Sequence, residues 1–145
     1  MGKKSTQSGS PLICLAHTLE THQGFTDVIA SLVDGHGGAI GGTWGSSSAL
    51  TVAALSQAQY REQSHDQKHG LVVVVLPHPA DADSFAEDLA LFTEDHVTIL
   101  PALETLGEPD DSSLTDPAEP ERLALVKQLT DSSCDNPRII VTTIH

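Results

Sequence analysis

With 145 residues, the chain has the length of one domain or of part of one. Its formal net charge of -13 gives a surface that repels phosphates, which disfavours autonomous nucleic-acid binding. Aromatic residues make up only 3% of the sequence, so any core must be built from Leu, Val, Ile and Ala.

Residues 1 to 24 begin with a Ser-, Gly- and Lys-rich tail, and we expect them to be disordered or poorly ordered. An α/β domain is expected to occupy residues 25 to 145. Apolar residues at helical spacing predict a helix from Phe25 to Val33, which Gly35 would end. After a glycine-rich stretch, a second helix is predicted from Ser46 to about Tyr60.

The aliphatic run Leu71 to Leu76 is short and β-branched, which is typical of a parallel strand buried on both faces. A helix is predicted from Pro79 to Phe92, followed by a short strand from Val97 to Leu100. Strands that alternate with helices favour a parallel sheet with crossover helices on its faces.

The last part of the chain opens with an acidic, Pro- and Ser-rich loop over residues 107 to 118. A helix is then predicted from Glu119 to Leu129, with Leu123, Val126 and Leu129 facing inward, and a final strand from Ile139 to Ile144. A doubly wound domain would continue with another helix, so we expect this one to be incomplete at its C-terminus. Neighbours of the last strand would then come from residues beyond His145 or from a second chain.

A degenerate phosphate-binding loop is the most informative local feature. An active loop has the pattern G-x-x-x-x-G-K-[ST], in which Lys neutralises phosphate charge and the hydroxyl binds Mg²⁺. The alignment uses the form Gly-x-x-Gly-x-Gly-Lys-Thr, with Gly42 on the first glycine. Gly45 then falls on the second glycine, Ser47 on the third, Ser48 on the lysine and Ala49 on the hydroxyl residue. The candidate loop residues are therefore Gly42, Gly45, Ser46, Ser47 and Ser48, and we expect no ATP hydrolysis there.

Two alternatives remain for this loop. It is either a Gly/Ser turn that opens a helix with a serine cap, or a weak site for sulfate or phosphate at a helix N-terminus. Trp44, the only tryptophan, would either pack or cover the space that a nucleotide otherwise occupies.

Other candidate sites are weaker. His65 and His69 have the i, i+4 spacing of a metal pair but lack an evident third ligand, so no metal site is expected. No Ser-His-Asp set can be argued, because Gly45-Ser46-Ser47-Ser48 lacks the second glycine of a nucleophile elbow. The acidic run from Asp81 to Glu121 contains no Lys or Arg. It is either a solvated face or a patch that docks on a basic partner.

Cellular location follows from what the sequence lacks. We find no signal peptide and no apolar run of transmembrane length. Cys14 and Cys134 fit no metal-ligand spacing, so reduced thiols in a cytoplasmic protein without membrane association are expected.

Taken in order, several segments resemble one family: the degenerate loop, the aliphatic strand, Pro77 to Asp83, Glu87 to Phe92, Glu104-Thr105-Leu106, Glu121-Arg122-Leu123 and the strand ending Val-Thr-Thr-Ile. This set is similar to the amino-terminal module of the bacterial transcription-repair coupling factor (Mfd), and so to the first domain of the excision-repair helicase subunit UvrB. The segment after Leu106 departs from the family, because Gly107-Glu108-Pro109 stands where the family has Pro-Tyr-Asp.

The resemblance implies a UvrB domain 1-like, P-loop NTPase-like fold and a non-catalytic scaffold in transcription-coupled nucleotide excision repair. The full-length parent would be an ATP- and Mg-dependent DNA translocase. It would recruit the UvrA repair ATPase and bind RNA polymerase, and it would bind DNA through other domains. The segment itself would need no cofactor. The alternative is a stand-alone α/β nucleotide- or anion-binding protein with a non-standard phosphate loop.

Overall fold

The computed structural model describes residues 12–62, 70–102, 118–130 and 137–144. Three strands form one sheet: β1 (Val72–Leu76), β2 (Val97–Ile99) and β3 (Ile139–Thr143). Their spatial order is β1-β3-β2, and β3 pairs in parallel with both neighbours. The expected parallel α/β fold is therefore confirmed, and its strands lie where the sequence predicts them.

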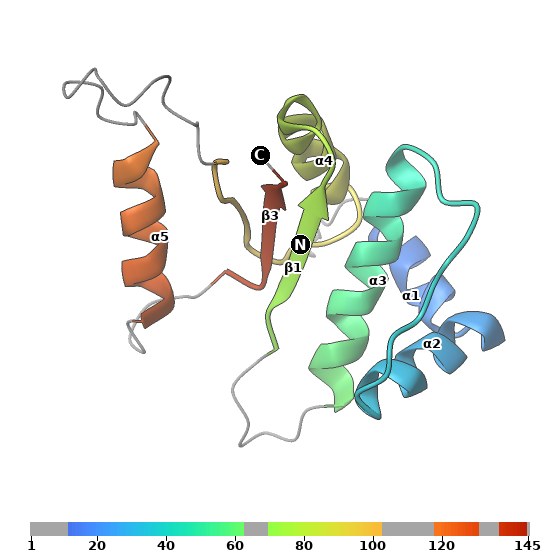
Figure 1. Ribbon diagram of the computed structural model, residues 1–145. Coiled ribbons are helices and arrows are strands. Elements are labelled where there is room, and N and C mark those ends of the chain that lie inside the picture. Colours follow the sequence, from blue (N-terminus) through green and yellow to red (C-terminus); the bar gives the residue numbers. More distant parts are fainter. Residues whose placement is uncertain (1–11, 63–69, 103–117, 131–136, 145) are drawn as a thin grey trace, which may run out of the picture.

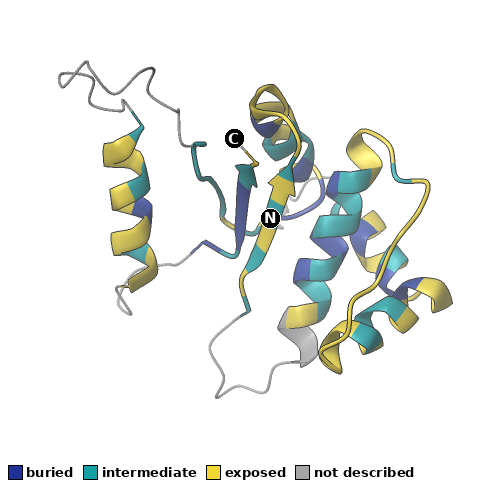
Figure 2. Cartoon of the chain, viewed as in Figure 1, coloured by how far each residue is buried: buried dark blue, intermediate teal, exposed yellow. Residues whose placement is uncertain are grey.

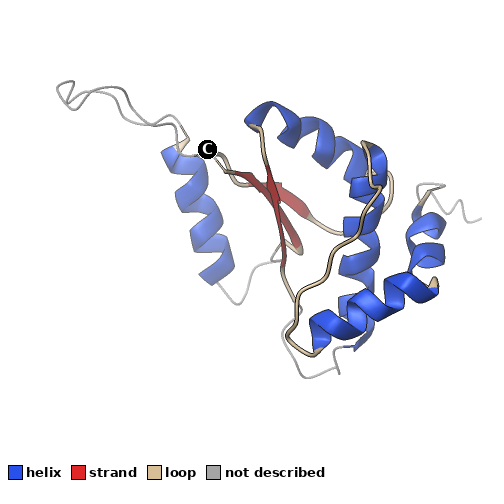
Figure 3. Cartoon of the chain, turned by 45° about the vertical axis from the view of Figure 1, so that its right-hand side comes forward, coloured by secondary structure: helices blue, strands red, loops and turns tan. Residues whose placement is uncertain are grey.

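Helices cover one face of the sheet (Figure 1). On one side lie α3 (Ser46–Glu62) and α4 (Ala82–Leu89), the latter preceded by the short 3₁₀ turn η1 (Pro79–Asp81). Outside α3 lie α1 (Ile13–Glu20) and α2 (Gln23–Val33), while α5 (Glu119–Thr130) stands alone on the opposite side in both views (Figure 3).

The end of α2 shows why its sequence prediction is confirmed. Gly35 has φ +78°, a left-handed conformation that favours glycine. The amide of Gly35 donates to the carbonyl of Leu32, and the amide of His36 donates to that of Ser31. These two bonds form a Schellman motif, which satisfies carbonyls that a helix end would otherwise leave open.

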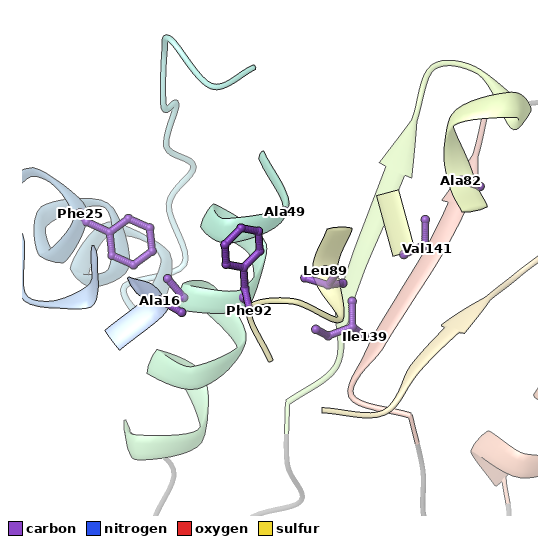
Figure 4. Packing of buried hydrophobic residues seen from close by; sticks show 10 residues of the cluster. Ala16, Phe25, Ala49, Ala82, Leu89, Phe92, Ile139 and Val141 are labelled. Atoms are coloured by element: carbon purple, nitrogen blue, oxygen red, sulfur yellow. The ribbon is translucent and has the colours of Figure 1, made fainter. Parts of the chain in front are cut away.

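The core lies between α3, α4 and one face of the sheet (Figure 4). Its α3 side is made of small side chains, Ala49, Ala53 and Ala54, all fully buried. Small residues let α1 and α4 approach α3 closely, and larger side chains from the facing elements fill the remaining space. These are Phe25, Leu89, Phe92, Ile139 and Val141.

The amino-terminal expectation is wrong for the described residues that precede Phe25. This segment contains α1, whose Ala16 is fully buried and belongs to the same core as Ala53. The alanine-rich surface of α3 needs a covering partner, and α1 supplies it. The polar tail over residues 1–11 lies outside the described part of the chain.

The expectation that β1 is buried on both faces is also wrong. Val72 and Val74 pack on the core, but Val73 and Val75 are 54% and 56% exposed (Figure 2). β1 is an edge strand, and α5 lies towards the opposite edge, where the Arg122 guanidinium donates to the carbonyl of Ala102. The second face of β1 therefore has no cover among the described elements.

Two further corrections concern the last part of the chain. In α5, Leu125 is the buried residue, whereas the three residues expected to face inward are exposed: Leu123, Val126 and Leu129. Since β3 lies between β1 and β2, both of its sides are already paired. The expectation that its other neighbours come from beyond His145 is wrong. The acidic loop 107–118 falls outside the described residues except for its last position.

Candidate functional site at the start of helix α3

The candidate phosphate loop joins α2 to α3 rather than a strand to a helix. The segment from Asp34 to Gly45 contains no regular element and directly follows α2. A working phosphate loop follows a strand, so that phosphate sits at the carboxyl edge of the sheet. The start of α3 lies near that edge in Figure 1, but the strand that should lead into the loop is replaced by a helix.

The amides at the start of α3 are already used within the loop. The Ser47 amide donates to the Trp44 carbonyl over 3.1 Å, and the Ser48 amide donates to the Gly45 carbonyl over 3.0 Å. In return, the Ser47 hydroxyl accepts a bond of 2.7 Å from the Trp44 amide. A phosphate cradle needs such amides to point outward together, and these two are turned back onto the loop.

A carboxylate of the protein is hydrogen-bonded to the first residue of α3. The Ser46 hydroxyl donates to Asp88 Oδ2 over 2.7 Å, and Ser46 is the first residue of α3. The partial positive charge of a helix N-terminus stabilises a carboxylate in this position. The same negative charge repels phosphate, which disfavours anion binding at the start of α3.

The loop glycines are explained by their backbone conformation and not by crowding against a neighbouring residue. Gly42 and Gly45 have φ +80° and +52°. A Cβ added at either position would meet no atom within 4 Å. The backbone conformation therefore explains both glycines, because larger residues rarely adopt positive φ.

Trp44 differs from both expectations. Its side chain is 83% exposed, so it neither packs in the core nor covers a cavity beside the loop. Of the other loop residues, Ser46 and Ser47 are exposed and Ser48 is half-buried. The structure thus brings the candidate residues together, but as a helix start whose amides are bonded within the loop and whose first hydroxyl is bonded to Asp88.

A second polar cluster was not found by sequence reasoning. Asp95 accepts a bond of 2.6 Å from the Ser56 hydroxyl and one of 3.1 Å from Arg138 Nη1. Ser56 lies on α3 and is 5% exposed. The two bonds of Asp95 therefore connect α3, the turn before β2 and the residue before β3. The members are about 40 residues apart in sequence, and no local motif marks them. This cluster lies at the amino ends of the strands, away from the usual ligand edge of α/β sheets.

Within the described ranges, no group of three His, Cys, Asp or Glu residues could hold a metal ion. His65 and His69 lie outside those ranges, as does Cys134. No helix in the described part of the chain is long and apolar enough to cross a membrane.

The fold and this site define the class of protein only broadly, as an α/β protein with a parallel sheet and a closed, degenerate loop. Comparisons with protein-family models, with curated proteins and with solved structures found no match. The resemblance to the coupling factor therefore depends on the sequence segments alone.

Proposed function

We propose that this chain is a non-catalytic interaction module. The observation that supports this best is the start of α3, where Asp88 accepts a bond from Ser46 and the amides of Ser47 and Ser48 are bonded within the loop. The lysine and metal-binding hydroxyl of an active loop are replaced by Ser48 and Ala49. Charge, hydrogen bonding and residue identity all oppose nucleotide chemistry at this position.

Isothermal titration of the chain with Mg-ATP is therefore expected to show no heat at millimolar nucleotide. An Asp88→Ala variant removes the carboxylate but leaves the loop amides bonded and the lysine absent, so it is expected to behave in the same way. A saturable micromolar Kd for the unmodified chain would contradict the proposal. It would favour the alternative of a stand-alone α/β nucleotide- or anion-binding protein.

We propose further that the module belongs to a transcription-repair coupling factor and acts as a scaffold in transcription-coupled nucleotide excision repair. The support is the ordered set of segments that resembles that family, together with an α/β fold and a degenerate loop. In this proposal the parent is a cytoplasmic, ATP- and Mg-dependent DNA translocase. Its other domains bind DNA and RNA polymerase and recruit the UvrA repair ATPase.

Deletion of the reading frame that encodes the chain tests this assignment. After ultraviolet damage, cells without it are expected to repair the transcribed strand no faster than the other strand. Unchanged preference for the transcribed strand would contradict the assignment. As a control for expression, the deleted strain should regain the preference when the intact reading frame is restored. The same reading frame should carry several hundred further residues with an intact Gly-Lys-Thr loop.

A further inference from the structure

An open groove of about 1210 Å³ runs between α4 and β2, which is an edge strand of the sheet in the described part of the chain. One wall is a single side of α4 and the residue after it: Asp83, Ala86, Glu87 and Ala90. These residues share a helical face because they are spaced by three or four positions. The other wall is the segment from Thr93 to Ile99, which includes all of β2.

The β2 wall offers unused backbone groups. The Leu100 amide donates to the Val141 carbonyl, and the His96 carbonyl accepts from Ile139. Because a strand alternates the direction of its backbone groups, the amides and carbonyls of Val97 and Ile99 point away from β3. In the part of the chain that the structure describes, no backbone group bonds to them. Such an edge is a template for another strand.

The charge of the groove selects its occupant. Asp83, Glu87 and Glu94 are exposed along its rim, and no Lys or Arg lines it. Asp95 also lines it, but its carboxylate is paired with Arg138. Between the acidic residues, Ala86 and Ala90 leave the α4 wall low and apolar. A second copy of the chain is a poor occupant, because its own net charge is -13.

We propose that this groove binds an extended, basic polypeptide segment that adds to β2 as a fourth strand. Main-chain hydrogen bonds to Val97 and Ile99 would hold the segment, as in other cases of strand addition. Lys or Arg side chains at alternate positions would point towards α4 and reach Asp83, Glu87 and Glu94, while the residues between them would point to the other face of the sheet. This site is separate from the loop at α3, and it does not depend on the assignment to DNA repair.

The direct test is fluorescence anisotropy of short labelled peptides with the full chain at physiological ionic strength. A peptide in which Lys and Val alternate is expected to bind with a saturable, micromolar Kd. A counterpart in which Lys and Pro alternate carries the same charge, but it lacks half the amides and cannot hold a pleated conformation. We expect it to bind about tenfold more weakly, from the loss of about 1.4 kcal/mol in main-chain bonding. Equal affinities for the two peptides would overturn strand addition.

Two matched double variants distinguish binding in the groove from non-specific attraction of a basic peptide to an acidic protein. The first, Asp83→Lys with Glu87→Lys, reverses the charge of the α4 rim. It is expected to weaken binding of the Lys-Val peptide by at least about tenfold. The second, Asp27→Lys with Asp34→Lys, makes the same change in net charge on exposed positions at α2 and is expected to change the affinity less than about twofold, since distant charges are screened. Equal weakening by both variants, or no peptide binding at all, would overturn the proposal.

Discussion

Replacing Leu89 with alanine is expected to lower the free energy of unfolding by about 3 kcal/mol, the largest effect we predict for one substitution. Leu89 is fully buried at the end of α4, in the same cluster as Phe92, Ile139 and Val141. The change removes buried methyl and methylene groups and leaves a cavity that the surrounding strands cannot fill without moving. Since a small domain is stable by only about 5–15 kcal/mol, the loss is severe.

Urea unfolding followed by far-ultraviolet circular dichroism measures this effect. Fluorescence of Trp44 is a poor probe, because that side chain is already 83% exposed in the folded state. Leu91→Ala is the matched control, since Leu91 is 44% exposed only two residues away. We expect it to cost less than about 1 kcal/mol. Similar losses for the two variants would mean that α4 does not pack on the sheet as described.

Local patterns predict most of the elements of this fold, because each depends on neighbours in sequence. The Gly35 stop of α2 and the aliphatic run of β1 are examples, and both elements lie close to their predicted bounds. Which face of an element is covered depends instead on distant parts of the chain. The exposure of Val73 and Val75 follows from the place of β1 at the sheet edge, which its own sequence does not specify.

In the candidate site, too, some features depend on neighbouring residues and others on distant parts of the chain. Residue identities at Ser48 and Ala49 predict the loss of nucleotide chemistry, and the geometry of the loop supports it. The bond between Ser46 and Asp88 could not be predicted, because the two residues are 42 positions apart in sequence. The helix before the loop was predicted from the Phe25 to Val33 pattern. Because α2 ends directly before the segment Asp34 to Gly45, no strand leads into the loop.

Replacing Asp95 with alanine is the second change expected to have a large effect, at about 2 kcal/mol of lost stability. Its carboxylate is the acceptor that joins Ser56 to Arg138. The variant leaves the Ser56 hydroxyl, on a residue that is 5% exposed, without this acceptor, and it removes the ion pair between Asp95 and Arg138. Glu87→Ala, at an exposed position on α4, is the control and is expected to cost less than about 0.5 kcal/mol.

A double-mutant cycle between Asp95→Ala and Ser56→Ala shows whether the two side chains act together. We expect the combined loss to be smaller than the sum of the single losses by about 1 kcal/mol, because either substitution already breaks their bond. Raising the salt concentration should weaken the bond to Arg138, which is 31% exposed, more than the bond to Ser56. The coupling between Asp95 and Ser56 is therefore expected to persist at high salt. Strict additivity of the two substitutions would show that this cluster does not tie α3 to the turn before β2.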